Sequence, residues 1–242
     1  MGVFLLEKIS KRIFLISSFV IVSVISFTIN RTHYEEVIST MAMPVTNKKI
    51  VVDAGHGGED GGAISQNGIS EASINLKISM KLQNLLEQSG AEVILTRSDE
   101  NAIYDLNKKT LREKKVSDIK NRVKIGNNSS ADVFVSIHLN KIDQSKYYGW
   151  QTFYKNKSEE GKLLATCIQN NLNASIQKEN NRVPLKIDNV YLIKHVEIPI
   201  TIVECGFLSK PEEEKQLQKD EYQDRLAWGI YNGIMDYFNE KD

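Results

Sequence analysis

The chain has 242 residues, of which 41% are hydrophobic, so it is long enough to bury a sizeable core, and we expect a single folded domain. Lysine plus arginine and aspartate plus glutamate are equal at 31 each, so the net charge is zero. A balanced charge gives no reason to expect a nucleic-acid partner, and none is predicted.

The N-terminal segment differs from the rest of the chain. Basic residues precede an uncharged apolar run over residues 13–29, which is near the lower limit for spanning a bilayer core of about 30 Å. Ser26 and Thr28 fit poorly to the small residues of a signal-peptide cleavage site. We therefore predict an uncleaved membrane anchor within residues 1–30, with the remaining chain outside the cytoplasm. A cleaved signal segment is the alternative.

Residues 31–47 are polar, have no sustained periodicity and include Pro44, which is typical of a tether. No internal repeat is visible in the sequence. We predict one folded domain over residues 48–242.

A strand, a glycine-rich turn and a helix are predicted at the start of this domain. The β-branched run from Ile50 to Val52 stops at Asp53, and the glycines that follow force tight turns around His56. Glu71 follows the potential N-cap Ser70 and opens an amphipathic pattern that extends to residue 89. A strand end and a helix start can thus present a nitrogen and a carboxylate to one point.

The later elements continue a pattern of alternating strands and helices. We predict strands at 92–96, 133–137, 148–154, 190–193 and 198–207, a surface loop at 98–115, and helices around 119–128, 163–172 and 222–237. The aromatic segment 148–154 is expected to be an edge strand. A strand followed by a helix and a strand is typical of an α/β fold with a mostly parallel sheet.

Three predicted strands end in residues that can carry out chemistry, namely His56, His138 and Glu204. Ligands of open α/β sheets bind outside the carboxyl ends of the strands, so we expect these side chains to converge there with Glu71. Two imidazoles and one carboxylate fit a catalytic zinc site with an open position for water, and the second carboxylate can act as base and acid. Each residue alone could equally be a surface histidine or a helix-dipole partner.

Several motifs occur together and in order: "VVDAGHGGEDGGA", then Glu71, then "ILTR", "FVSIHLN" and "IVECGFLS". Together they resemble the zinc-dependent N-acetylmuramoyl-L-alanine amidases of the type 3 family, from Lys49 to the end of the chain. The resemblance implies a zinc-exopeptidase-like domain with a twisted, mostly parallel sheet and helices on both faces. It also implies that His56, Glu71 and His138 bind one Zn²⁺ and that Glu204 is the catalytic carboxylate.

The family hydrolyses peptidoglycan at the amide between muramic acid and L-alanine of the stem peptide. Arg97 and Arg122 match family positions, and we expect structural ion pairing for both more than substrate contact. His195 precedes the last strand and is a third weak candidate for substrate contact. Cys167 and Cys205 are expected to be free thiols in a buried environment.

The short anchored architecture is similar to that of the germination-specific enzymes of spore formers, which act in muramic-δ-lactam formation in the spore cortex. This similarity implies an extracytoplasmic enzyme, membrane-anchored or secreted, whose regulation comes from elsewhere, for example from an accessory protein. A vegetative autolysin is the alternative within the family. Alternatives of another class are a zinc peptidase and an inactive peptidoglycan-binding module.

Overall fold

The computed structural model describes residues 17, 19–29, 31, 43–142 and 147–241, and the chain divides into two compact units, residues 1–42 and 43–242. In the first unit, residues 19–29 are helical. The predicted apolar run also includes residues 13–16 and 18, which lie outside the described residues. Among the residues that the structure describes, no helix is long and apolar enough to cross a membrane.

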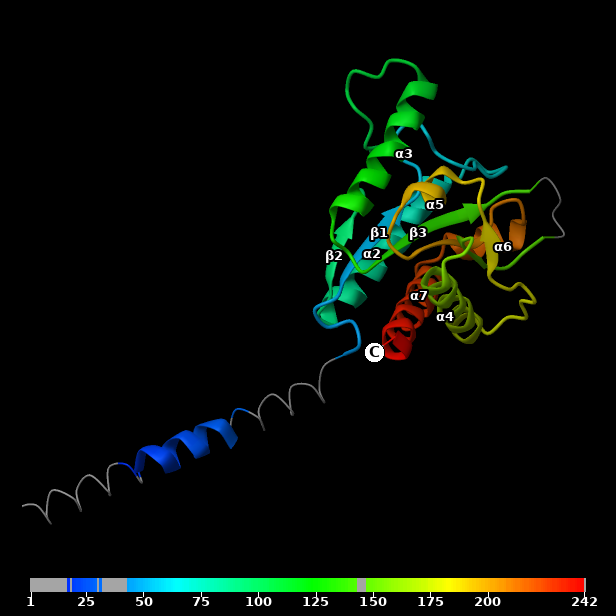
Figure 1. Ribbon diagram of the computed structural model, residues 1–242. Helices are drawn as coiled ribbons and strands as arrows, with labels where there is room; N and C mark the ends of the chain where they lie inside the picture. The colour runs from blue at the N-terminus through cyan, green and yellow to red at the C-terminus, as the bar shows by residue number, and fades with distance from the viewer. Residues whose placement is uncertain (1–16, 18, 30, 32–42, 143–146, 242) are drawn as a thin grey trace, which may run out of the picture. The chain divides into compact units, whose positions relative to one another are not determined.

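The second unit is an α/β domain (Figure 1). Its strands are β1 (Lys49–Ala54), β2 (Glu92–Leu95), β3 (Val133–Asn140), β4 (Gln151–Lys155), β5 (Leu185–Ile187) and β6 (Ile200–Phe207). Its helices are α2 (Glu71–Gln88), α3 (Leu111–Asn128), α4 (Glu159–Ile176), α5 (Tyr191–His195), α6 (Pro211–Leu217) and α7 (Asp220–Lys241). The predicted domain start at residue 48 lies within this unit, close to its beginning.

The six strands form one sheet in the order β2-β1-β3-β6-β4-β5. Neighbouring strands are parallel except for β4 and β6, which are antiparallel. The predicted mostly parallel sheet is thus confirmed. The expectation of an edge strand at 148–154 is wrong, because β5 pairs with the outer side of β4.

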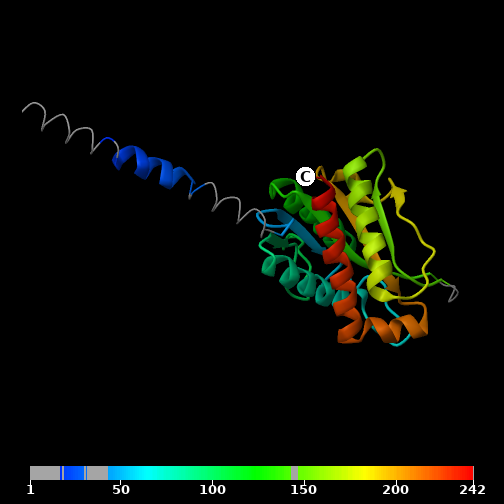
Figure 2. The ribbon, with the colours of Figure 1, turned by 90° about the horizontal axis from the view of Figure 1, so that it is seen from below.

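Helices cover both faces of the sheet (Figure 2). The larger core lies under α2, α4 and α7, and the smaller core lies on the opposite face with residues of α3 and α5. Successive strand residues point to opposite faces, so Val133 and Val135 enter the larger core while Phe134 enters the smaller one. By the same alternation, His138 lies on the face of the smaller core.

Helix α3 begins earlier than expected, within the segment predicted as a loop at 98–115. The Thr110 hydroxyl accepts from the Glu113 backbone N–H at 3.2 Å, and the Glu113 carboxylate accepts from the Thr110 N–H at 2.9 Å. This capping box supplies partners for free N–H groups at the helix start. The T-x-x-E spacing was the available signal, but the dense charge on this helix concealed its periodicity.

The strand predicted at 190–193 is wrong, because Tyr191–His195 forms the short helix α5. Leu192 and Ile193 are buried in the smaller core. A short apolar run does not distinguish a strand from a buried helical turn. The three-residue strand β5 and the helix α6 were not predicted from the sequence.

Candidate active site

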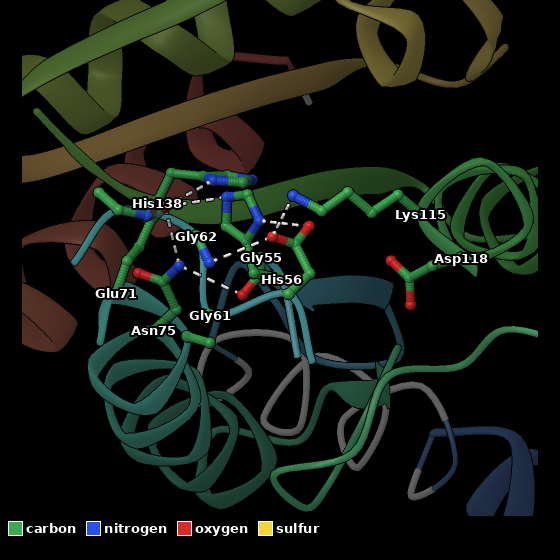
Figure 3. A network of polar contacts seen from close by, with 12 residues as sticks. Gly55, His56, Gly61, Gly62, Glu71, Asn75, Lys115, Asp118 and His138 are labelled. Carbon is green, nitrogen blue, oxygen red and sulfur yellow. Dashed lines mark hydrogen bonds and ion pairs between the residues drawn. The ribbon is translucent and has the colours of Figure 1, made fainter. Parts of the chain in front are cut away.

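The carboxyl ends of β1 and β3 bring the predicted site residues to one edge of the sheet (Figure 3). His56 follows β1, His138 lies in the last part of β3, and Glu71 is the first residue of α2. Glu204 of β6 is the register partner of His138. The fold therefore gathers residues that lie far apart in the sequence.

The two histidines and Glu71 surround one point. Glu71 Oε1 lies 2.9 Å from His138 Nδ1 and 3.4 Å from His56 Nε2. One ligand atom from each of the three residues lies within 4.8 Å of the others. The imidazole rings are nearly perpendicular, at 82°. The structure thus brings together all three predicted metal ligands.

Two glycines make this close approach possible. A Cβ atom on Gly55 would lie 2.3 Å from the His138 ring, and one on Gly62 would lie 2.6 Å from both Glu71 Oε2 and the His56 ring. Gly62 also has a φ of 67°, and His56 itself adopts a φ of 62°, which is uncommon for a residue with a side chain. The glycine-rich motif is needed because both the space and the backbone conformation exclude larger residues.

Glu71 is held as an ionised carboxylate. Its Oε1 also accepts from the Leu139 N–H at 3.1 Å and from Asn75 Nδ2 at 3.2 Å, and its Oε2 accepts from the Ala63 N–H at 2.8 Å. Burial alone would raise its pKa, but hydrogen bonds and charge from the two histidines outweigh this effect and lower the pKa. Glu71 therefore offers a fixed, negatively charged oxygen to the centre of the group.

A carboxylate outside the group orients His56. Asp60 Oδ2 lies 3.1 Å from His56 Nδ1, and Lys115 Nζ of α3 lies 2.8 Å from Asp60 Oδ1. Burial opposes protonation of His56, but hydrogen bonds to Asp60 and Glu71 raise its pKa to about 9. Carboxylates that orient a ligating histidine in this way are common around metal ions. Asp60 and Lys115 were not predicted as site residues, although Asp60 lies within the glycine-rich motif.

Glu204 differs from Glu71 in having an oxygen without a protein partner. Its Oε2 is enclosed and accepts no hydrogen bond from any residue that the structure describes. Burial raises the pKa of Glu204 to about 7, and the nearby His138 offsets only part of this effect. A carboxyl group with a pKa near neutrality can both accept and donate a proton.

Arg97 and Arg122 are both buried beneath the site. The Arg122 guanidinium pairs with Asp53 at 2.6 Å and with Asp118 at 2.6 Å, and it also donates to the backbone oxygen of His56. Arg97 donates instead to the backbone oxygens of Ala54, Gly55, Ala72 and Asp99. Arg122 thus makes the expected ion pairs, whereas Arg97 stabilises the loops through backbone carbonyls.

The structure does not bring His195 to the group. This histidine is exposed at the end of α5, where its Nδ1 lies 2.9 Å from the Tyr191 backbone oxygen. Its own backbone oxygen accepts from Asn127 at the end of α3. His195 thus lies before the start of β6, whereas Glu204 lies in the second half of that strand.

The donor set fits a divalent metal ion. Two imidazole nitrogens and one carboxylate oxygen face one another, which matches the three protein ligands of many catalytic zinc sites. The second carboxylate, Glu204, lies nearby, and its Oε2 accepts no hydrogen bond from the described residues. This arrangement could hold a metal ion beside an acid–base group.

Comparisons with known proteins give a consistent result. The sequence profile of the N-acetylmuramoyl-L-alanine amidase family matches residues 50–236. The germination-specific N-acetylmuramoyl-L-alanine amidase of Bacillus subtilis is 36% identical over 200 residues, which cover 83% of this chain and 84% of that protein. The amidase LytC of the same organism is 31% identical and matches 84% of this chain but 38% of its own length.

Solved structures also match the described domain. A structure of the CwlD amidase from Clostridioides difficile in complex with the GerS lipoprotein is similar with a TM-score of 0.78 and 48% identity, covering 80% of this chain and 100% of that chain. An N-acetylmuramoyl-L-alanine amidase from Clostridium difficile 630 matches with a TM-score of 0.71 and 32% identity, covering 81% of this chain and 100% of that chain.

Proposed function

The chain belongs to the N-acetylmuramoyl-L-alanine amidase family and is an amidase, and on this premise we propose that it is a zinc-dependent peptidoglycan hydrolase. It cleaves the amide between the lactyl group of muramic acid and L-alanine of the stem peptide. The observation that carries this proposal is the convergence of His56, Glu71 and His138 beside Glu204, whose Oε2 has no partner among the described residues.

In this proposal His56, Glu71 and His138 hold one zinc ion through the atoms that face one another. When bound, the ion supplies Lewis-acid chemistry, including a decrease in the pKa of water from ~15.7 to about 7. Asp60 keeps the ring of His56 oriented, and the backbone N–H of Leu139 fixes the carboxylate of Glu71.

Glu204 transfers the proton in this mechanism. Its carboxylate takes a proton from the attacking water as the C–O bond forms, and it later gives that proton to the amine nitrogen as the C–N bond breaks. The products are a free lactyl carboxylate and a stem peptide with a free amino terminus. The raised pKa of Glu204, about 7, suits both steps near neutral pH.

The biological role that we propose is muramic-δ-lactam formation in the spore cortex. The similarity to the germination-specific amidase of Bacillus subtilis supports this role. A vegetative autolysin remains the second candidate, because 84% of this chain also matches LytC, an amidase that is not named as germination-specific. We also propose an accessory protein as a partner, since the similar CwlD chain was solved in complex with a lipoprotein.

Extracytoplasmic action follows from a peptidoglycan substrate. We retain the proposed organisation of an anchor or signal segment over 1–30, a tether over 31–47 and a catalytic domain over 48–242. In this arrangement the domain acts on the cell wall close to the membrane surface or after secretion.

The proposal is tested on the purified full-length chain. Metal content is measured by mass spectrometry, and the chain and its Glu204→Gln variant are incubated with peptidoglycan. About one equivalent of zinc and the release of intact stem peptides by the unsubstituted chain alone would support the proposal. Cleavage between amino acids would instead indicate a peptidase, and binding without cleavage by the zinc-loaded chain would indicate a binding module.

A further inference from the structure

A row of polar side chains extends across the sheet from the candidate metal group. His138 of β3 is paired in register with Glu204 of β6, and Glu204 is paired with Gln151 of the antiparallel strand β4. Side chains of residues that lie directly opposite one another on neighbouring strands point to the same face of the sheet. His138, Glu204 and Gln151 therefore lie side by side on the face of the smaller core.

Arg182 continues this row on the far side of β4. Its Nη1 donates to Gln151 Oε1 at 2.8 Å, while Gln151 Nε2 donates to the backbone oxygen of Val183 at 2.9 Å. The segment that carries Arg182 thus lies next to the start of β4. The order across the sheet is the metal group, the acid–base carboxylate, the amide of Gln151 and the guanidinium of Arg182.

The guanidinium of Arg182 is fixed in place. Its Nε donates to the backbone oxygen of Tyr148 at 3.0 Å. Its Cζ lies 4.7 Å from the centroid of the Phe207 ring and 5.9 Å from that of the Tyr147 ring. These contacts with aromatic rings and with the Gln151 amide restrict the side chain without neutralising its charge.

Arg182 lacks a carboxylate partner within the part of the chain that the structure describes. No described aspartate or glutamate lies within ion-pair distance of its guanidinium, and no described residue accepts a hydrogen bond from its Nη2. The buried Glu213 carboxylate accepts hydrogen bonds from the backbone N–H groups of Gly149 and Phe207. Burial raises the pKa of Glu213, and the charge of Arg182 acts on this carboxylate without an ion pair and offsets part of the rise. A hollow of about 240 Å³ opens beside Arg182, lined also by Tyr147, Tyr148, Asn180 and Asn181.

We propose that Arg182 is a specificity-determining residue that binds a carboxylate of the stem peptide on the leaving-group side of the scissile amide. This inference rests on the proposed function, in which Glu204 protonates the departing amine. The substrate then extends from Glu204 past Gln151 toward Arg182. The scissile carbonyl then lies at the metal group and the amine at Glu204, and the residues that follow the amine extend past Gln151 to Arg182, whose guanidinium favours a carboxylate.

The spacing of the row agrees with this assignment. Neighbouring strands lie about 4.8 Å apart, so two strand spacings cover roughly 10 Å. An extended peptide advances about 3.4 Å per residue, so two or three residues span that distance. The ligand class is therefore a short acidic peptide with a free carboxylate near its second residue, which a guanidinium binds through charge-assisted hydrogen bonds.

The test compares two synthetic muramyl peptides that differ at one group, the carboxylate of the second residue being either free or amidated. Zinc-loaded full-length chain is compared with its Arg182→Met, Arg182→Lys and Lys186→Met variants, and kcat and KM are measured for each substrate. Lys186 lies on the exposed strand β5 and controls for the loss of one positive charge.

We expect the unsubstituted chain to prefer the free carboxylate by about 10- to 100-fold in kcat/KM, which is the usual effect of a hydrogen bond to a charged group. In Arg182→Met the ratio falls to about 1, mainly through a higher KM for the acidic substrate. Arg182→Lys keeps part of the preference, and Lys186→Met keeps all of it. Loss of a purely structural contact would instead slow both substrates equally.

An unchanged ratio in Arg182→Met, or equal cleavage of the two substrates by the unsubstituted chain, would overturn the inference alone. If zinc-loaded chain cleaves neither substrate, the proposed function fails, and the inference fails with it. Should Arg182→Met not fold, the Arg182→Lys variant decides, because a ratio identical to that of the unsubstituted chain together with an unchanged KM would show that the guanidinium of Arg182 does not determine the preference.

Discussion

The carboxylates of Asp53 and Glu204 lie on the same sheet but have opposite chemical environments. Asp53 of β1 accepts hydrogen bonds from Thr96 and Ser136 and pairs with Arg122 at 2.6 Å. Burial would raise its pKa, but the charge of Arg122 and the two hydroxyls outweigh burial and lower it. Glu204 has no such partners at Oε2 among the residues that the structure describes, and burial raises its pKa to about 7.

The difference shows how one fold separates stability from reactivity. Arg122 also donates to the backbone oxygens of Ala54 and His56, so the Asp53 pair holds the loop that positions a proposed metal ligand. Glu204 instead keeps an oxygen that has no hydrogen-bond partner among the described residues and is available for proton transfer. Asp53 has its hydrogen-bond and ion-pair partners within the protein, whereas Glu204 can exchange a proton with the substrate.

Substitution of the reactive carboxylate has the largest expected effect. In Glu204→Gln we expect kcat to fall by about 10²- to 10⁴-fold, because the amide cannot transfer a proton. Zinc content, measured by mass spectrometry, should stay the same as in the unsubstituted chain. A zinc-loaded variant that releases stem peptides at the original rate would remove Glu204 from the mechanism.

Substitution of Asp53, the carboxylate with partners in the protein, is expected to lower the stability of the fold. In Asp53→Asn the buried charge of Arg122 loses a partner, so the free energy of unfolding should fall by about 3 to 5 kcal/mol. Urea denaturation measures this change. The control is Glu92→Gln, which breaks the exposed Lys49–Glu92 pair of 2.9 Å and should cost about 0 to 1 kcal/mol. Equal effects of the two substitutions would contradict a structural role for Asp53.

The pH dependence of stability should have opposite signs at the two carboxylates. The pKa of Asp53 is lowered on folding, so its contribution is present above its unfolded pKa and is lost as the pH falls through its folded pKa. The pKa of Glu204 is raised from 4.5 to about 7, so its relative stabilisation is present below 4.5 and is lost as the pH rises through 7.

In metal-free protein at pH 8.5, Glu204→Gln should therefore raise the free energy of unfolding by about 1 to 3 kcal/mol, and this gain should shrink toward pH 4.5. Asp53→Asn should show the reverse trend, with its penalty decreasing only at acidic pH. Urea titrations of chelator-treated protein at several pH values measure both trends. A constant effect of Glu204→Gln across this range would show that the carboxyl group does not change its pKa on folding.

Asp60 is intermediate between Asp53 and Glu204, because it is paired with both His56 and Lys115 but lies at the edge of the site. Asp60→Asn should weaken zinc binding by about 10-fold, at the lower end of the range for groups that orient a metal ligand. Competition with a chelator measures the affinity. The control is Glu59→Gln, which disturbs only the outward pair with Lys114. Equal zinc affinities of the two variants would limit Asp60 to a structural role.

The parts of the fold with a strong periodic signal were predictable. The buried β-branched runs of β1, β3 and β6 and the stripes of α2 and α7 agree with the structure to within a few residues. The weaker elements were not, because α5 and β5 are short and depend on contacts with distant segments. Strand β4 has a strand pattern, but its position inside the sheet depends on pairing with β5.

The sequence by itself determined the residue types of the site and their order: a histidine in a glycine-rich turn, a glutamate at a helix start, and a histidine and a glutamate on buried strands. These features can be predicted because they depend on the residue itself and on its neighbours in the sequence. Tertiary structure alone decided which charged and polar side chains meet. Asp53 meets Arg122 from 69 positions away, and Asp60 meets Lys115 of α3. Gln151 lies opposite Glu204 in the sheet and accepts a hydrogen bond from Arg182. These pairings depend on strand order and register, which no local pattern specifies.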